Sequence, residues 1–298
     1  MVRFLRRRPL AAAALAILGI VATGWSGAAG AQPSRSYVAL GDSYTAGPVI
    51  PVQQTDPPGC LRSDHNYPHL VAATLGLTLT DASCSGATTA DMTSPQSVTP
   101  GPPNPPQFDR LMPDTKLVTL GIGGNDIGFV SIIENCGALS PYGPTLSGSS
   151  TCQAHYVTNG DDQISDSIRA TAPKVAAVLD GIHQRSPEAR VYVVNYLDIL
   201  PLTGTGCWPQ MPLTYADVPY LRAKEVELNG MLASTAAAHH AGVVDAYTAS
   251  VGRDACQLPT ARWVEPVVPV NPAAPVHPNA AGMAGTAAAV AATIKVPR

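Results

Sequence analysis

The chain has 298 residues, of which 45% are hydrophobic and 13% charged, with 29 prolines and 26 glycines. This composition excludes an intrinsically disordered protein and indicates a compact, loop-rich one with a sizeable core. The formal net charge is −3, and residues 32–298, with 14 basic and 21 acidic residues, carry −7. Such an acidic surface argues against nucleic acid as a partner and against electrostatic docking on anionic membranes.

Residues 1–31 have the features of a secretory signal peptide. An apolar run from Leu10 to about Val21 is followed by Ala29-Gly30-Ala31, a small-residue cleavage pattern. The basic residues before this run are Arg3, Arg6, Arg7 and Arg8. The run is short for a membrane span, so an uncleaved anchor is the less favoured alternative, and the adjacent arginines leave a twin-arginine route open. We expect a secreted protein, outside the cell or in its envelope, in which residues 32–298 form a single domain.

All six cysteines follow this segment. They are Cys60, Cys84, Cys136, Cys152, Cys207 and Cys256. An even number in an exported chain predicts three disulfides, for which 15 pairings exist. We favour sequential pairing, because it closes the shortest loops. No zinc site is expected, since no pair has C-x-x-C spacing and no histidine lies near a cysteine at zinc-finger spacing.

Strands and helices are expected to alternate along the chain. The first strand is the apolar run 38–40, which ends in Gly41-Asp42-Ser43. Further strands are predicted at 77–81, 116–120, 190–196 and 243–247, and helices at 66–75, from about 126, at 161–185, 217–240 and 279–294. The proline-dense segment 95–106 and the Gly/Ser/Tyr-rich segment 134–161 are expected to be loops. The alternation predicts a three-layer α/β/α sandwich around a doubly wound, five-stranded parallel sheet of the flavodoxin-like type.

Four residues that could take part in catalysis follow strands or precede a helix, at the edge where ligands bind in such sheets. Ser43 is a candidate nucleophile and His277, directly before the last helix, a candidate base. The Gly86 N–H and the Asn125 amide are candidate donors to an oxyanion. An ester hydrolase needs these groups. Each also has an ordinary role open to it: helix capping for the serine and asparagine, a tight turn for the glycine, and a surface position for the histidine.

The order of these residues resembles the GDSL family of serine hydrolases, also called SGNH hydrolases. The matching blocks are Gly41-Asp42-Ser43, Gly86, Gly123-Gly124-Asn125-Asp126 and His277-Pro278-Asn279. The six-cysteine layout is most similar to the secreted actinobacterial lipases and phospholipases of this family. The resemblance implies that Ser43 is the nucleophile and His277 the base, and that the Ser43 N–H, Gly86 N–H and Asn125 amide form the oxyanion hole. It implies no metal or organic cofactor, and Asp42 then shapes the turn.

One departure from the family pattern concerns the third catalytic residue. The family usually has an aspartate three residues before the histidine, and here that position is Ala274. The imidazole Nδ1–H must still be held to fix the tautomer. We therefore predict a Ser–His dyad in which the main-chain carbonyl of Ala274 orients His277. The alternative is that Glu265, the nearest upstream carboxylate, or another distant acid completes a triad.

The loop before His277 is apolar. This predicts either a surface beside the base that contacts acyl chains or lipid, or a satellite cluster of the core under the loop. Its residues are Trp263, Val264, Val267, Val268, Val270, Ala273 and Ala274. We expect a monomer that hydrolyses small-molecule or lipid esters with apolar acyl chains, with transient lipid-surface contact. A carbohydrate O-acetyl esterase is one alternative, disfavoured by an aromatic content of 5%. A catalytically silent cell-surface binding protein on the same fold is the other.

Overall fold

The computed structural model of the chain describes residues 1, 35–139, 150–203 and 206–294. The expected signal peptide, apart from Met1, lies outside these residues. Contacts between residues divide the chain into two units, Met1–Pro33 and Ser34–Arg298, and the second holds the described residues from 35 onward. No helix in its described part is long and apolar enough to cross a bilayer.

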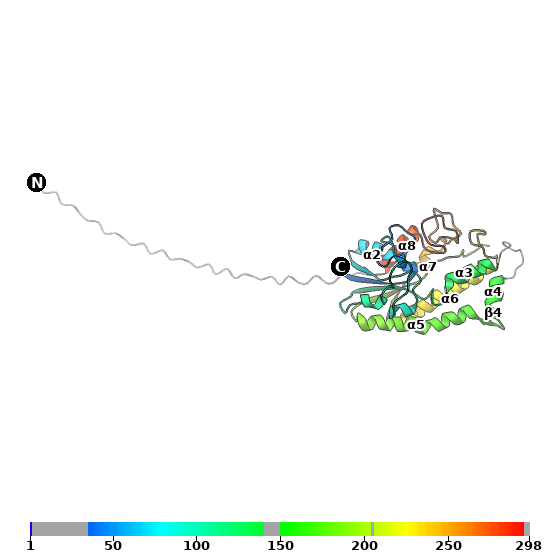
Figure 1. Cartoon of the computed structure of the whole chain (residues 1–298), viewed down its shortest axis with the longest axis horizontal. Helices are drawn as coiled ribbons and strands as arrows, with labels where there is room; N and C mark the ends of the chain where they lie inside the picture. Colours follow the sequence, from blue (N-terminus) through cyan, green and yellow to red (C-terminus); the bar gives the residue numbers. More distant parts are fainter. Residues whose placement is uncertain (2–34, 140–149, 204–205, 295–298) are drawn as a thin grey trace. The chain divides into compact units, whose positions relative to one another are not determined.

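A five-stranded parallel sheet forms the centre of this unit (Figure 1). Its strands are β1 Ser36–Gly41, β2 Thr78–Asp81, β3 Leu117–Gly121, β6 Arg190–Val194 and β7 Gly242–Val244. Their order is β2-β1-β3-β6-β7. The winding therefore reverses between β1 and β3, and the carboxyl edge at this reversal is where ligands bind in open α/β sheets. The predicted fold class is confirmed.

Helices cover both faces of the sheet, with α2 packed against α8 and α5 against α6 (Figure 1). The α-helices are α1 Ser43–Ala46, α2 Tyr67–Leu75, α3 Phe129–Ala138, α4 Thr151–Tyr156, α5 Gln163–Arg185, α6 Asp217–Ala238, α7 Ala246–Ser250 and α8 Ala280–Thr293. Short 3₁₀ helices are η1 Pro58–Cys60, η2 Thr89–Met92 and η3 Gln107–Arg110. Asn66 and Asn279 cap α2 and α8 through their side-chain oxygens. Both faces of β1 and β3 are thus buried, which explains their nearly continuous apolar sequences.

Three expected elements differ most from the structure. Helix α3 begins at Phe129, not near residue 126, because Gly128 at φ 68° ends a preceding turn. Strand β7 stops at Val244, since Asp245 caps α7 by accepting a hydrogen bond from the Thr248 N–H. The segment 134–161 is more ordered than expected: it holds α4 and the first strand of the small hairpin formed by β4 Val157–Thr158 and β5 Asp161–Asp162. Residues 140–149 of this segment lie outside the described part.

All three disulfides follow the sequential pairing. They join Cys60 to Cys84, Cys136 to Cys152 and Cys207 to Cys256. The first joins η1 to the loop after β2, the second joins α3 to α4, and the third joins the segment before α6 to the segment after α7. The favoured pairing is therefore confirmed.

Candidate active site

Ser43 is the first residue of α1, at the carboxyl end of β1. Asp42 caps this helix, because its Oδ1 accepts a hydrogen bond from the Tyr44 N–H at 2.9 Å. Its Oδ2 accepts one from the Tyr196 hydroxyl at 2.5 Å. Burial raises the pKa of Asp42 to about 7, although both hydrogen bonds favour the charged carboxylate. Asp42 thus shapes the turn, as expected from the sequence.

His277 lies against Ser43 although the two are 234 residues apart in sequence, with 2.7 Å between Nε2 and the serine Oγ. Its Nδ1 lies 2.6 Å from the main-chain carbonyl oxygen of Pro275. A carbonyl only accepts hydrogen bonds, so Nδ1 carries the proton and Nε2 is free to accept the Ser43 hydroxyl hydrogen. Burial lowers the pKa of His277, partly opposed by the hydrogen bond to Pro275, so the ring is neutral at pH 7.

The carbonyl that faces the imidazole is that of Pro275, and the prediction of the Ala274 carbonyl is wrong. The Ala274 oxygen instead accepts the backbone N–H of His277 at 3.3 Å, which closes a tight turn. The central residues of this turn are Pro275 and Val276, and the valine has φ 60°, as at the third position of a type II turn. Its conformation leaves the Pro275 carbonyl free to meet the ring. A β-branched residue at positive φ is strained, and such strain clusters at functional sites.

Glu265 does not contact the imidazole. Its carboxylate accepts hydrogen bonds from the Val270 N–H, the Asn271 N–H and side-chain amide, and the Asn279 amide. These bonds hold the pKa of Glu265 below its usual value, against the opposite effect of burial. The glutamate meets His277 only along the backbone, where its N–H donates to the His277 carbonyl at 2.9 Å. Glu265 therefore fixes the loop that carries the histidine.

The two candidate oxyanion loops are joined to each other. The Asn125 side-chain amide donates one hydrogen bond to the Ala87 carbonyl, next to Gly86, at 2.9 Å. Gly86 has φ 79°, a conformation that favours glycine. In the described part of the chain, neither its N–H nor that of Ser43 finds a hydrogen-bond acceptor. The Cys84 N–H ties the Gly86 loop to the Gly41 carbonyl, two residues before Ser43, at 3.0 Å.

A narrow cavity of about 20 Å³ opens at Ser43. Its walls come from the serine turn, the Asn125 loop, α3, the segment after β6, and α6. The lining residues are Asp42, Ser43, Tyr44, Gly124, Asn125, Phe129, Val130, Tyr196, Ile199, Glu225 and Leu228. Burial raises the pKa of Glu225 well above its usual range, which favours the neutral form of this side chain. Among the described residues, no three His, Cys, Asp or Glu side chains gather as a metal site would require.

The apolar loop before His277 does not line this cavity. Val264 and Ala273 are buried and belong to the core or its edge. Val268 and Val270 are exposed, at 70% and 67%. The lining instead comes from Phe129, Val130, Ile199 and Leu228, which no local sequence pattern marks as part of the site.

Two tyrosines that the sequence did not single out connect the parts of the site. The Tyr196 hydroxyl accepts a hydrogen bond from the Gly124 N–H at 2.7 Å and donates to Asp42, so it joins the Asn125 loop to the serine turn. The Tyr44 hydroxyl donates to the Val276 carbonyl at 2.6 Å, and its ring lies 5.1 Å from that of His277. The position of Tyr44 directly after Ser43 is the one signal in the sequence that pointed to this role.

Known proteins share this fold and much of this sequence. The model of the GDSL-like Lipase/Acylhydrolase family matches residues 39–284. Lipase 2 of Streptomyces coelicolor is 42% identical over 267 residues, which are 87% of this chain and 86% of that protein. The crystal structure of the extracellular lipase of Streptomyces rimosus aligns with a TM-score of 0.70 at 28% identity, and that of phospholipase A1 of Streptomyces albidoflavus NA297 with 0.69 at 26%. Each alignment covers 87% of this chain and 99% of the other.

These relatives define a carboxylic ester hydrolase. The α/β/α fold agrees with this class, because it brings a serine and a histidine into contact where the winding of its sheet reverses. The family match covers more than half of the chain, and a relative above 30% identity spans most of it. The protein belongs to the GDSL-like Lipase/Acylhydrolase family.

Proposed function

We propose that the protein is a secreted lipase or esterase that cleaves esters of apolar acyl chains through an acyl-Ser43 intermediate. The observation that carries this proposal is the 2.7 Å contact between Ser43 Oγ and His277 Nε2, with Nδ1 held by Pro275. This arrangement is a Ser–His dyad in which a main-chain carbonyl, in place of the usual carboxylate, orients the imidazole. The dyad also disfavours a catalytically silent binding protein, because binding alone does not require a base oriented toward a serine hydroxyl.

In the proposed mechanism, His277 Nε2 takes the hydroxyl proton as Ser43 Oγ attacks the ester carbonyl. The negative charge on the tetrahedral oxygen is met by the Ser43 N–H, the Gly86 N–H and the second amide hydrogen of Asn125. The imidazolium then protonates the leaving alcohol as the ester C–O bond breaks. Water, activated by the same imidazole, attacks the acyl-enzyme, and release of the acid restores the Ser43 hydroxyl.

We assign the first carbons of the acyl chain to the narrow cavity that opens at Ser43. Its apolar wall of Phe129, Ile199 and Leu228 favours a hydrocarbon chain over a sugar. A second hollow shares Asn125 with this cavity and is lined by η2, η3 and α5, including Met92, Phe108, Lys174 and Val178. We assign it to the alcohol part of the ester, since Asn125, a proposed donor to the oxyanion, lines both hollows.

Export is the second part of the proposal. It is supported by the signal-peptide features of residues 1–31, by three disulfides, and by the description of one relative as extracellular. The exposed Val268 and Val270 suit transient contact with a lipid surface. We propose a monomeric enzyme without a nucleic-acid partner.

A series of substrates tests this function directly. Rates with p-nitrophenyl esters of increasing chain length, with a phospholipid and with an acetylated xylo-oligosaccharide separate the substrate classes. We expect the highest kcat/KM on an ester with an acyl chain longer than acetyl. A preference for the acetylated sugar over every p-nitrophenyl ester would support the carbohydrate esterase instead.

Replacement of Glu265 by glutamine separates the dyad from a triad. We expect kcat/KM to stay within about tenfold of the wild-type value, whereas loss of a true triad carboxylate costs about 10⁴-fold in kcat. We also expect a lower melting temperature, because charge-assisted hydrogen bonds of about 1.5–3 kcal/mol each are weakened. Kinetics and thermal unfolding of the same preparation measure both effects. A loss of several hundredfold in kcat at an unchanged melting temperature would make Glu265 a catalytic group.

The pH profile follows from the lowered pKa of His277. The base must be neutral, so activity is lost as pH falls through its pKa, and we expect the acid limb of kcat/KM to have its midpoint below 6.5, the ordinary histidine value. The stability of the fold changes in the same direction. As pH falls, His277 is protonated in the unfolded chain at a higher pH than in the folded one, so the free energy of unfolding decreases below pH 6.5. Asp42, whose pKa is about 7, titrates in the same pH range. The pH profile of Asp42→Asn shows how much of the acid limb of kcat/KM is due to Asp42. A midpoint above 6.5 that persists in this variant contradicts the assignment.

A further inference from the structure

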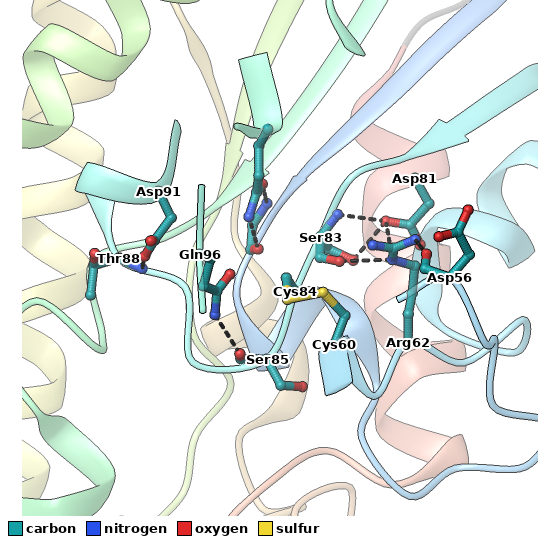
Figure 2. The surroundings of a disulfide bond; sticks show 12 residues. Asp56, Cys60, Arg62, Asp81, Ser83, Cys84, Ser85, Thr88, Asp91 and Gln96 are labelled. Carbon is teal, nitrogen blue, oxygen red and sulfur yellow. Dashed lines mark hydrogen bonds and ion pairs between the residues drawn. A yellow bond between two sulfur atoms is a disulfide. The ribbon is translucent and has the colours of Figure 1, made fainter. Parts of the chain in front are cut away.

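The peptide unit between Ser85 and Gly86 carries the proposed oxyanion donor at one end and a side-chain contact at the other. Its carbonyl, that of Ser85, accepts a hydrogen bond from Gln96 Nε2 at 2.8 Å (Figure 2). Its N–H, that of Gly86, has no acceptor within the residues described, and Gly86 is exposed. A trans peptide is planar, so its C=O and N–H point in opposite directions. Whatever fixes the carbonyl therefore fixes the direction of the N–H.

Contacts on the amino-terminal side of this unit are strong but do not set its rotation. The Cys60–Cys84 disulfide, the Ser85 N–H donating to the Cys60 carbonyl at 2.9 Å, and Arg62 Nε donating to the Ser83 carbonyl at 2.7 Å hold the chain up to Ser85 (Figure 2). Glycine follows, and glycine accepts both signs of φ at little cost. The Ala87 N–H also donates to the Cys84 carbonyl at 3.1 Å and closes a turn around the Ser85–Gly86 peptide. Type I and type II turns share such a bond and differ in the orientation of the central peptide, so the Gln96 contact to the Ser85 carbonyl favours one of the two orientations.

Gln96 is itself held firmly in place. It is 91% buried, since its exposed fraction is 9%. Its backbone N–H and carbonyl both pair with Asn104 at 2.9 Å, an isolated antiparallel bridge across the proline-dense segment 95–106. This pairing gives an otherwise irregular surface loop a fixed position against the Gly86 loop.

We propose that Gln96 is a positioning residue for the oxyanion hole. It orients the Ser85–Gly86 peptide so that the Gly86 N–H points to the developing oxyanion. Its donation to the Ser85 carbonyl also polarises the peptide and makes that N–H a stronger donor, as in chains of hydrogen bonds. The inference rests on the proposed ester hydrolysis, and it adds a role for a side chain that touches neither substrate nor reacting atoms.

The test is Gln96→Met, which keeps the length of the side chain and removes the donor. We expect kcat to fall about 10- to 100-fold, less than the loss of a direct oxyanion donor, with KM nearly unchanged. A boronic acid or trifluoromethyl ketone that mimics the tetrahedral oxyanion should bind more weakly by the same factor. Gln96→Leu, which also lacks a donor, should show the same pattern and is the second variant in case the methionine variant does not fold.

The matched control is Gln257→Met. That glutamine also donates a side-chain hydrogen bond, to Asp254 at 2.9 Å, away from the Gly86 loop. We expect it to keep wild-type kinetics. The inference is overturned if the folded Gln96 variants keep kcat within about twofold of wild type, or lose it without weaker binding of the oxyanion mimic. A wild-type enzyme that cleaves no ester, or a Ser43→Ala variant that still does, overturns the proposed function instead.

Discussion

Ser43→Ala is expected to lower kcat/KM by about 10⁴- to 10⁶-fold, because the acyl-enzyme route is lost and only binding and the oxyanion donors remain. The fold should survive. Asp42 still caps α1 through the Tyr44 N–H, and a methyl group fits where the mostly buried hydroxyl was. Hydrolysis of the best p-nitrophenyl ester and the melting temperature measure the two effects.

Ser234→Ala is the matched control for this variant. That serine is exposed on α6 and donates only to the Met231 carbonyl in its own helix. It should keep full activity. A Ser43→Ala variant that retains more than about one part in a hundred of the wild-type rate would mean that the hydroxyl is not the nucleophile.

His277→Ala is expected to cost nearly as much as the serine variant, since nucleophile and base act as a unit. Without the imidazole, nothing at Nε2 accepts the Ser43 proton, and no other described side chain takes that hydrogen bond. Both acylation and deacylation should slow, so kcat falls while KM changes little. Stopped-flow kinetics with a p-nitrophenyl ester separate the two steps.

His155→Ala is the control for the histidine variant, because that ring lies on α4 against Tyr156 and not against Ser43. Wild-type rates are expected for it. The assignment of His277 as base fails if its alanine variant keeps a burst of p-nitrophenol at the wild-type rate.

Much of the site could be predicted because its chemistry lies at the ends of regular elements. Ser43 and Asn125 follow buried apolar strands, and His277 precedes a helix whose cap, Asn279, is evident in the sequence. Parallel strands bring such positions to one edge of a sheet. Sequential disulfides followed from loop length alone.

Other features depended on conformations or distant contacts that local sequence does not encode. The carbonyl of Ala274 was predicted because Ala274 stands where the family usually has its aspartate. Val276 instead adopts φ 60°, and its contacts with Tyr44 and Pro266 hold the turn in which the Pro275 carbonyl faces the ring. The Tyr196–Asp42 contact spans 154 residues.

Labelling with a fluorophosphonate, followed by intact mass and peptide mapping, tests the central claim most directly. The reagent reports an activated nucleophile whatever the true substrate is. We expect one adduct per chain, located on Ser43, absent from Ser43→Ala and formed far more slowly by His277→Ala. A wild-type protein that takes up no label, or a Ser43→Ala variant that is labelled as fast as wild type, would contradict the account.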